Sequence, residues 1–172
     1  MSFGPPPVIP TLAPYGQLSQ SAVKCVAKAS AYYRVPELLM YSILWKEDGR
    51  AGMMNKNRNG TYDLGPAQIN TSWLFLFSSY GITLKDLRYN ECTNIYAEAW
   101  VLKYNANKLS GNWFRAAMAY NIGANAHDPT VLRIGYRYAV SVIHIWWKLR
   151  AYAETHPQLL ASNPGPKVFS PN

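Results

Sequence analysis

One glutamate in this sequence, Glu47, lies where it could act as a proton donor. The apolar segment before it opens at Val35-Pro36, because proline is tolerated at the first position of a helix. Its apolar stripe at helical spacing comprises Leu38, Leu39, Ile43 and Leu44. Gly49 is a natural stop, so Glu47 is expected in the last turn, where the helix dipole disfavours a carboxylate. Desolvation near Trp45 acts in the same direction. The sequence therefore predicts a raised pKa and a protonated acid, which donation to a leaving oxygen requires.

Four short motifs follow Glu47 in order along the chain. A glycine-led segment reads Gly65-Pro66-Ala67-Gln68-Ile69-Asn70, and Asn94-Ile95 stands near the start of a long predicted helix. Ala119-Tyr120-Asn121 closes another apolar segment, and Tyr138 lies in a third. Each motif alone is short, but five in this order and spacing form a specific pattern.

With these motifs the chain resembles the lytic transglycosylases with a goose-type-lysozyme-like catalytic domain. The likeness runs from about Val23 to Tyr152 and is greatest to the small members that accompany conjugation, type III secretion and type IV pilus machines. The resemblance implies peptidoglycan glycan strands as substrate, no cofactor, and possible partners in a machine that spans the cell envelope. Glu47 would be the catalytic acid. The substrate-binding residues implied are Gly65, Gln68, Asn70, Tyr120, Asn121 and Tyr138.

Individual roles follow from the same resemblance. Gln68 would bind sugar amides, and Gly65 would allow close backbone approach. Tyr120 would lie over the acid or the reacting sugar, Asn121 would bind polar substituents and Tyr138 would close the cleft. Three positions depart from the family pattern. Asp48 stands where the family usually has Ser, and Pro66-Ala67 replaces Leu-Met, which removes a methionine that packs beneath the sugar.

A second carboxylate, which most glycosidases need, is hard to find among the nine acidic residues. Asp48 would point to a different side of the helix from Glu47. Asp63 is the better candidate, although an aspartate in such a loop is more often a turn former. Asn70 is an amide and cannot act as a base. The missing base favours the transglycosylase route, in which the 6-hydroxyl of the sugar attacks and 1,6-anhydromuramic acid is the product.

Two alternatives use the same site differently. Glu47 and Asp63 could form a hydrolytic muramidase, whose product gains water. The altered Pro66-Ala67 loop could instead belong to a catalytically weak wall-binding assembly module. A nucleic-acid binder is disfavoured, because the charge of +8 is spread from Lys24 to Lys167 without a basic run. Diffuse positive charge suits the anionic bacterial wall or simply aids solubility.

The two cysteines, Cys25 and Cys92, could be inert buried thiols or a disulfide, depending on the compartment. The family resemblance favours a disulfide. No metal site is expected, because the three histidines, His127, His144 and His156, do not form a zinc-binding spacing with the cysteines.

The predicted fold is mainly α, an α+β lysozyme-like domain with two lobes, a central cleft and at most a vestigial hairpin at Asn59-Gly60. Helices are expected over about 19–33, 35–48, 72–80, 83–88, 90–109, 112–120 and 128–156, with 90–109 the longest. Five tryptophans are assigned to the core rather than to sugar platforms: Trp73, Trp100, Trp113, Trp146 and Trp147.

The predicted domain covers residues 19–156, between a proline-rich lead-in at 1–18 and a loose tail at 157–172. The lead-in lacks the charge and apolar core of a signal peptide, and no segment is long and apolar enough to span a membrane. The expected location is periplasmic or extracellular, with a removed leader, another export route or carriage in a virion.

Overall fold

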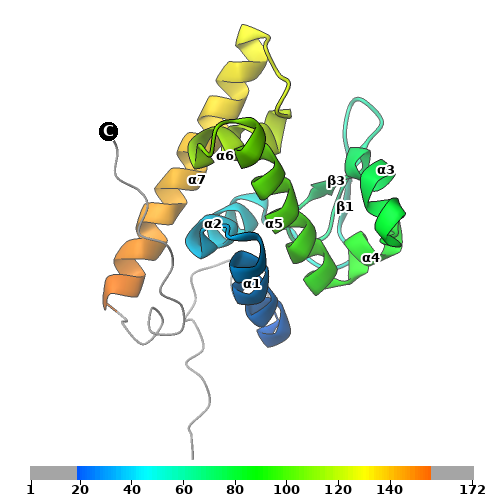
Figure 1. Ribbon diagram of the computed structural model, residues 1–172, viewed down its shortest axis with the longest axis horizontal. Coiled ribbons are helices and arrows are strands. Elements are labelled where there is room, and N and C mark those ends of the chain that lie inside the picture. The colour runs from blue at the N-terminus through cyan, green and yellow to red at the C-terminus, as the bar shows by residue number, and fades with distance from the viewer. Residues whose placement is uncertain (1–18, 156–172) are drawn as a thin grey trace, which may run out of the picture.

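The computed structural model describes residues 19–155, which form seven α-helices and a three-stranded sheet. The mainly helical class predicted from the sequence is confirmed (Figure 1). The predicted lead-in, His156 and the predicted tail lie outside the described residues.

The first two helices carry much of the core. Helix α1 (Gln20–Tyr33) is capped by Ser19, whose hydroxyl accepts the Ala22 N–H. Helix α2 (Glu37–Glu47) is buried along residues 39–44. Its last residue is Glu47, as the sequence predicts.

The stop of α2 differs from the prediction. Asp48, not Gly49, takes the left-handed conformation that ends the helix, with φ 49°. Aspartate tolerates this conformation better than most residues. Asp48 therefore lies beyond the helix rather than on it. Gly49 is required for another reason, because a Cβ there would lie 2.3 Å from the Gly65 carbonyl oxygen.

The hairpin prediction is confirmed and the sheet is larger than predicted. Strand β1 (Met54–Lys56) pairs antiparallel with β2 (Tyr62–Leu64) around a turn where Gly60 has φ 84°. Strand β3 (Ile69–Asn70) adds to β2 and brings the predicted Gln68-Ile69-Asn70 segment to Asp63. The third strand is only two residues long, too short for a periodic pattern to mark it.

The predicted helix over 72–80 is three short pieces: η2 (Thr71–Trp73), α3 (Leu74–Phe77) and η3 (Ser78–Tyr80), which ends at Gly81. Helix α4 (Leu84–Tyr89) begins at Thr83, as predicted. Thr83 and Asp86 form a capping box there.

Three longer helices complete the domain. Helix α5 (Glu91–Lys108) is capped by Asn90, and α6 (Trp113–Ile122) by Asn112. Helix α7 (Pro129–Thr155) has 27 residues against 18 in α5, so the prediction that α5 is the longest is wrong. Gly135 does not interrupt α7. It is buried against α6, where a Cβ would lie 2.5 Å from Ile122 Cδ1.

Helix α5 runs through the middle of the structure (Figure 1). The sheet, α3 and α4 lie on one side of it, and α2, α6 and α7 lie on the other. The Cys25–Cys92 disulfide joins α1 to α5, as the resemblance implied, with 5.4 Å between the two Cα atoms. None of the helices within 19–155 is long and apolar enough to cross a membrane.

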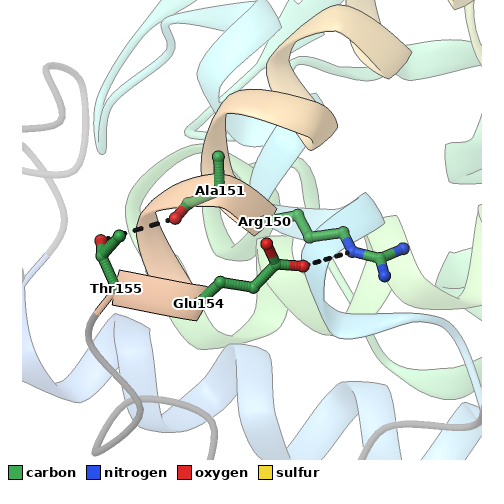
Figure 2. A network of polar contacts seen from close by, with 4 residues as sticks. All are labelled: Arg150, Ala151, Glu154 and Thr155. Carbon is green, nitrogen blue, oxygen red and sulfur yellow. Dashed lines mark hydrogen bonds and ion pairs between the residues drawn. The ribbon is translucent and has the colours of Figure 1, made fainter.

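The prediction of core tryptophans is wrong at Trp147, and Trp73, Trp100 and Trp113 are only partly buried against the core. Trp146 is buried on α7, but Trp147 is 55% exposed because the next residue of a helix turns toward another side. Near the end of α7, Arg150 Nε and Glu154 Oε1 form an exposed pair at 3.0 Å (Figure 2).

Candidate active site

Glu47 is joined to Tyr138 across two helices. The Tyr138 hydroxyl, from α7, donates a hydrogen bond to Glu47 Oε1 at 2.5 Å. The pKa of Glu47 is raised from 4.5 to about 7, and burial of the carboxyl is the largest cause. The Tyr138 hydrogen bond opposes the rise, the charge of Asp63 adds to it, and Lys46 lowers it. Glu47 can therefore hold a proton near neutral pH and also release it.

The loop that starts at Gly65 is held by a buried side chain of α5. Asn94 Nδ2 donates to the carbonyls of Leu64 and Leu87, both at 2.7 Å, and Asn94 Oδ1 accepts the Ala67 N–H at 2.8 Å. Gly65 has φ 67°, and a Cβ there would lie 2.4 Å from Asn94 Nδ2. The close approach that Gly65 permits in this structure is therefore to Asn94.

Gln68 and Tyr120 both bind backbone of this loop. Gln68 Nε2 donates to the Gly65 carbonyl at 2.7 Å, and its Oε1 accepts from Asn55 Nδ2 at 2.7 Å. The Tyr120 hydroxyl, from α6, donates to the Ala67 carbonyl at 2.7 Å. These bonds fix the loop between β1, α5 and α6.

Asp63 and Asn70 face each other across strands β2 and β3. Asn70 Nδ2 donates to Asp63 Oδ1 at 2.7 Å and to Thr61 Oγ1 at 3.0 Å. The carboxylate of Asp63 is near enough to raise the pKa of Glu47. Asn121 is exposed near the end of α6 and takes no part in these hydrogen bonds.

The sequence analysis missed one acid, Glu98 of α5. Its side chain is 0% exposed, and neither carboxylate oxygen has a hydrogen-bond partner within residues 19–155. Burial and then the charge of Glu47 raise its pKa well above the usual value. Burial, and then the charge of Glu98, raise the pKa of Tyr120 well above its usual value. The sequence could have marked Glu98 as buried, because it lies four residues after Asn94 on the face of α5 that also carries Ile95 and Leu102.

Residues 19–155 contain no group of three histidine, cysteine, aspartate or glutamate side chains placed to hold an ion. The polar groups shown to interact with Glu47 include the Tyr138 hydroxyl and the carboxyls of Asp63 and Glu98. Such groups suit hydrogen bonding and proton transfer.

A protonatable acid on a helix end, opposite a loop fixed by amides, suits the lysozyme-like glycan-cleaving class on this mainly helical frame. Residues 24–134 match the Transglycosylase SLT domain, and the chain belongs to that family. Its domain is therefore of the lytic transglycosylase type, which acts on peptidoglycan.

Curated relatives extend this likeness. The chain is 29% identical over 127 residues to the invasion protein IagB of Salmonella typhimurium (strain SL1344), covering 73% of this chain and 77% of that protein. It is also 29% identical over 129 residues to the X polypeptide of Escherichia coli, covering 74% of this chain and 76% of that protein.

Proposed function

We propose that the protein is an active lytic transglycosylase that cleaves the β-1,4 bond between N-acetylmuramic acid and N-acetylglucosamine without adding water. The observation that carries this proposal is the environment of Glu47. A carboxyl with a pKa of about 7 can serve first as acid and then as base.

The reaction would need one carboxyl in two successive roles. Glu47 would give its proton to the glycosidic oxygen as the bond from that oxygen to C1 of the muramic acid breaks. The resulting carboxylate would take the proton of the 6-hydroxyl, whose oxygen bonds to C1 and closes the 1,6-anhydro ring. Glu47 then carries a proton again, and no water is consumed. Intramolecular attack is favoured because the nucleophile is already held beside the reacting carbon.

The tyrosines would set the position and proton affinity of the acid. Tyr138 holds Oε1 of Glu47 and favours its charged form, which the second step needs. Tyr120 would fix the loop under the sugar through its bond to the Ala67 carbonyl. Gln68, Asn70 and Asn121 would contact the sugar. Gln68 would have to exchange at least one internal hydrogen bond for one to substrate.

A hydrolytic muramidase is the second candidate, and one observation favours it. The carboxylate of Asp63 is close enough to act on Glu47, as a base for water would be. Against it, one oxygen of Asp63 already accepts a hydrogen bond from the Asn70 amide.

We place this activity at the bacterial wall, in the periplasm or outside the cell. The SLT domain and the diffuse charge of +8 fit an anionic wall substrate. The Cys25–Cys92 disulfide fits an oxidising compartment. Likeness to an invasion protein agrees with local wall opening for an envelope-spanning machine, as in secretion, conjugation, pilus or phage assembly.

Mass spectrometry of the fragments released from purified sacculi tests the proposal. Wild type should release 1,6-anhydromuramic ends, and Glu47→Gln should release almost none. Asp48→Asn is the matched control, since it changes an exposed acid one residue away and should leave the product unchanged. Fragments with hydrated reducing ends would support the muramidase. Binding to sacculi without any fragment would support the wall-binding module.

A further inference from the structure

A pocket of about 340 Å³ lies beside the C-terminal half of α5. Its lining includes Trp73, Tyr104, Asn105 and Lys108, together with residues 122–126 that follow α6. Glu47 is not among the lining residues. The volume is within the range of small-molecule sites, and the mixture of aromatic wall and few polar groups is typical of them.

Asn105 is the unusual member of this lining. Its side chain is 1% exposed, and neither its amide nitrogen nor its amide oxygen has a hydrogen-bond partner within the described chain. An unsatisfied buried polar group destabilises the fold, and such groups are rare in folded proteins. The cost is recovered if a ligand in the pocket supplies the missing partners.

The amide of Asn105 restricts the chemistry of that ligand. It offers both an N–H donor and a carbonyl acceptor. The acetamido group of a sugar also has a donor and an acceptor, but as a trans amide it directs them to opposite sides. One acetamido group can therefore pair with one function of Asn105, and a neighbouring sugar hydroxyl can pair with the other. A hydroxyl can donate to the carbonyl and accept from the N–H, whereas a protonated amine can only donate.

The walls of the pocket suit the apolar face of a sugar ring. Trp73 and Tyr104 meet edge to face, with 5.3 Å between ring centroids. Trp100 stacks on Tyr104 at 5.1 Å and meets Trp73 at 5.6 Å, so each wall ring is held by its neighbours. Rings fixed before binding lose little entropy when a ligand stacks against them.

The pocket is in reach of the same glycan strand but away from the bond that is cut. Asn105 lies seven residues after Glu98 on α5, which is two turns or about 10 Å along the same face. Glu98 is the residue of α5 whose charge is coupled to Glu47. The lining at Ile122 begins two residues after Tyr120.

The charge of Lys108 also affects which sugars the pocket can bind. Its ammonium lies over the Tyr104 ring at 4.9 Å and lines the pocket. A sugar that has lost its acetyl group carries a protonated amine, which this ammonium repels. The pocket therefore disfavours glucosamine both by charge and by the loss of partners for Asn105.

We propose that this pocket is a sugar subsite remote from the scissile bond, and that Asn105 makes it selective for N-acetylated residues. The proposal rests on the proposed function only in taking the bound strand to be the one that Glu47 cleaves.

Calorimetric titration of the Glu47→Gln protein, which cannot consume its ligand, tests the subsite directly. The probes are tetrasaccharides of N-acetylglucosamine and of glucosamine, compared at pH 6. The acetylated probe should bind at least tenfold more tightly, as loss of about one well-made hydrogen bond implies. Adding Asn105→Leu should weaken binding of the acetylated probe about tenfold and remove most of the preference for it over the glucosamine probe. Adding Asn107→Leu, at an exposed position of the same helix, should change neither value.

Urea unfolding separates a binding role from a structural one. Asn105→Leu should be as stable as its parent or more so, since it replaces an unpartnered amide by an apolar group of similar size. If Asn105→Leu binds the acetylated probe as well as its parent, or if both probes bind equally to the parent, the subsite proposal is wrong. If the preference is present but wild type releases no fragments from sacculi, the subsite stands and the proposed activity fails.

Discussion

Two glutamates, Glu47 of α2 and Glu98 of α5, differ in how far they are buried and in what surrounds them. Burial raises the pKa of both. Glu47 stands at a helix end, remains partly accessible and is held by Tyr138. Glu98 stands inside α5, is fully covered, and has no hydrogen-bond partner among the described residues. Burial alone makes an acid neutral, whereas a partner and an open side allow it to exchange a proton with substrate.

The largest expected difference between the two glutamates is in the rate of wall cleavage. Glu47→Gln should lower the rate of wall cleavage by about 10²- to 10⁴-fold, because it removes the proton donor. Glu98→Gln should keep most of the activity, since burial disfavours the charged form of the Glu98 carboxyl and the amide that replaces it has a similar shape. Fragment release from sacculi measures both. Equal damage from the two substitutions would give Glu98 a direct part in the chemistry.

The next largest difference between the two glutamates is expected in the stability of their Gln variants at alkaline pH. A glutamate with a raised pKa in the folded state contributes stability that is fully present below about pH 4.5 and is lost as the pH rises through the folded value. Each pKa unit of difference between the folded and unfolded states changes the free energy of unfolding by about 1.4 kcal/mol. Glu98→Gln should therefore match wild type near pH 4.5 and exceed it at pH 9, by more than Glu47→Gln does. Urea unfolding at the two pH values checks this. If wild type is as stable as Glu98→Gln at pH 9, ionisation of Glu98 does not lower the stability of the fold.

Tyr138→Phe tests the partner that only Glu47 has. The Tyr138 hydrogen bond lowers the pKa of Glu47, so its removal should raise that pKa from about 7. The alkaline limb of the activity profile should move upward by about one pH unit, the size expected for one hydrogen bond to a charged group. Tyr136→Phe, an exposed tyrosine on the same helix, is the control. A limb that stays in place or moves to lower pH would contradict the assignment.

Asp63 extends the comparison to an acid held by an amide. Asp63→Asn should lower stability by about 1 kcal/mol through the weakened contact with Asn70. It should reduce cleavage only modestly, and the products should keep their 1,6-anhydro ends. Thermal unfolding and product mass measure the two effects. Loss of activity as deep as in Glu47→Gln, together with hydrated ends in wild type, would favour the muramidase.

The smallest effect is expected at an exposed acid. Glu154→Gln breaks the surface pair with Arg150 (Figure 2) and should cost about 0.3–0.5 kcal/mol, less in high salt. Urea unfolding at low and high salt measures it. If Glu154→Gln lowers the free energy of unfolding more than Asp63→Asn does, the exposure of an acid does not predict its contribution to stability.

Local signals in the sequence were enough for much of the fold. Ser19, Thr83, Asn90 and Asn112 each cap the helix that they predict, because a capping side chain binds backbone only two or three residues away. The Asn59-Gly60 turn likewise fixed its hairpin. The prediction failed where neighbours distant in the chain decide, as at Gly49 and in the short strand β3.

The sequence by itself determined the family motifs, the position of Glu47 at the end of α2 and the candidate disulfide. It could predict a raised pKa for Glu47, because a helix end and an apolar neighbourhood are local properties. Only the tertiary structure decided that Tyr138 holds this acid, that Asn70 holds Asp63, and that Glu98 and Asn105 are buried without partners among the described residues. The physical reason is that burial and hydrogen bonding depend on which helices and strands meet, and α2 and α7 meet here across 91 residues of sequence.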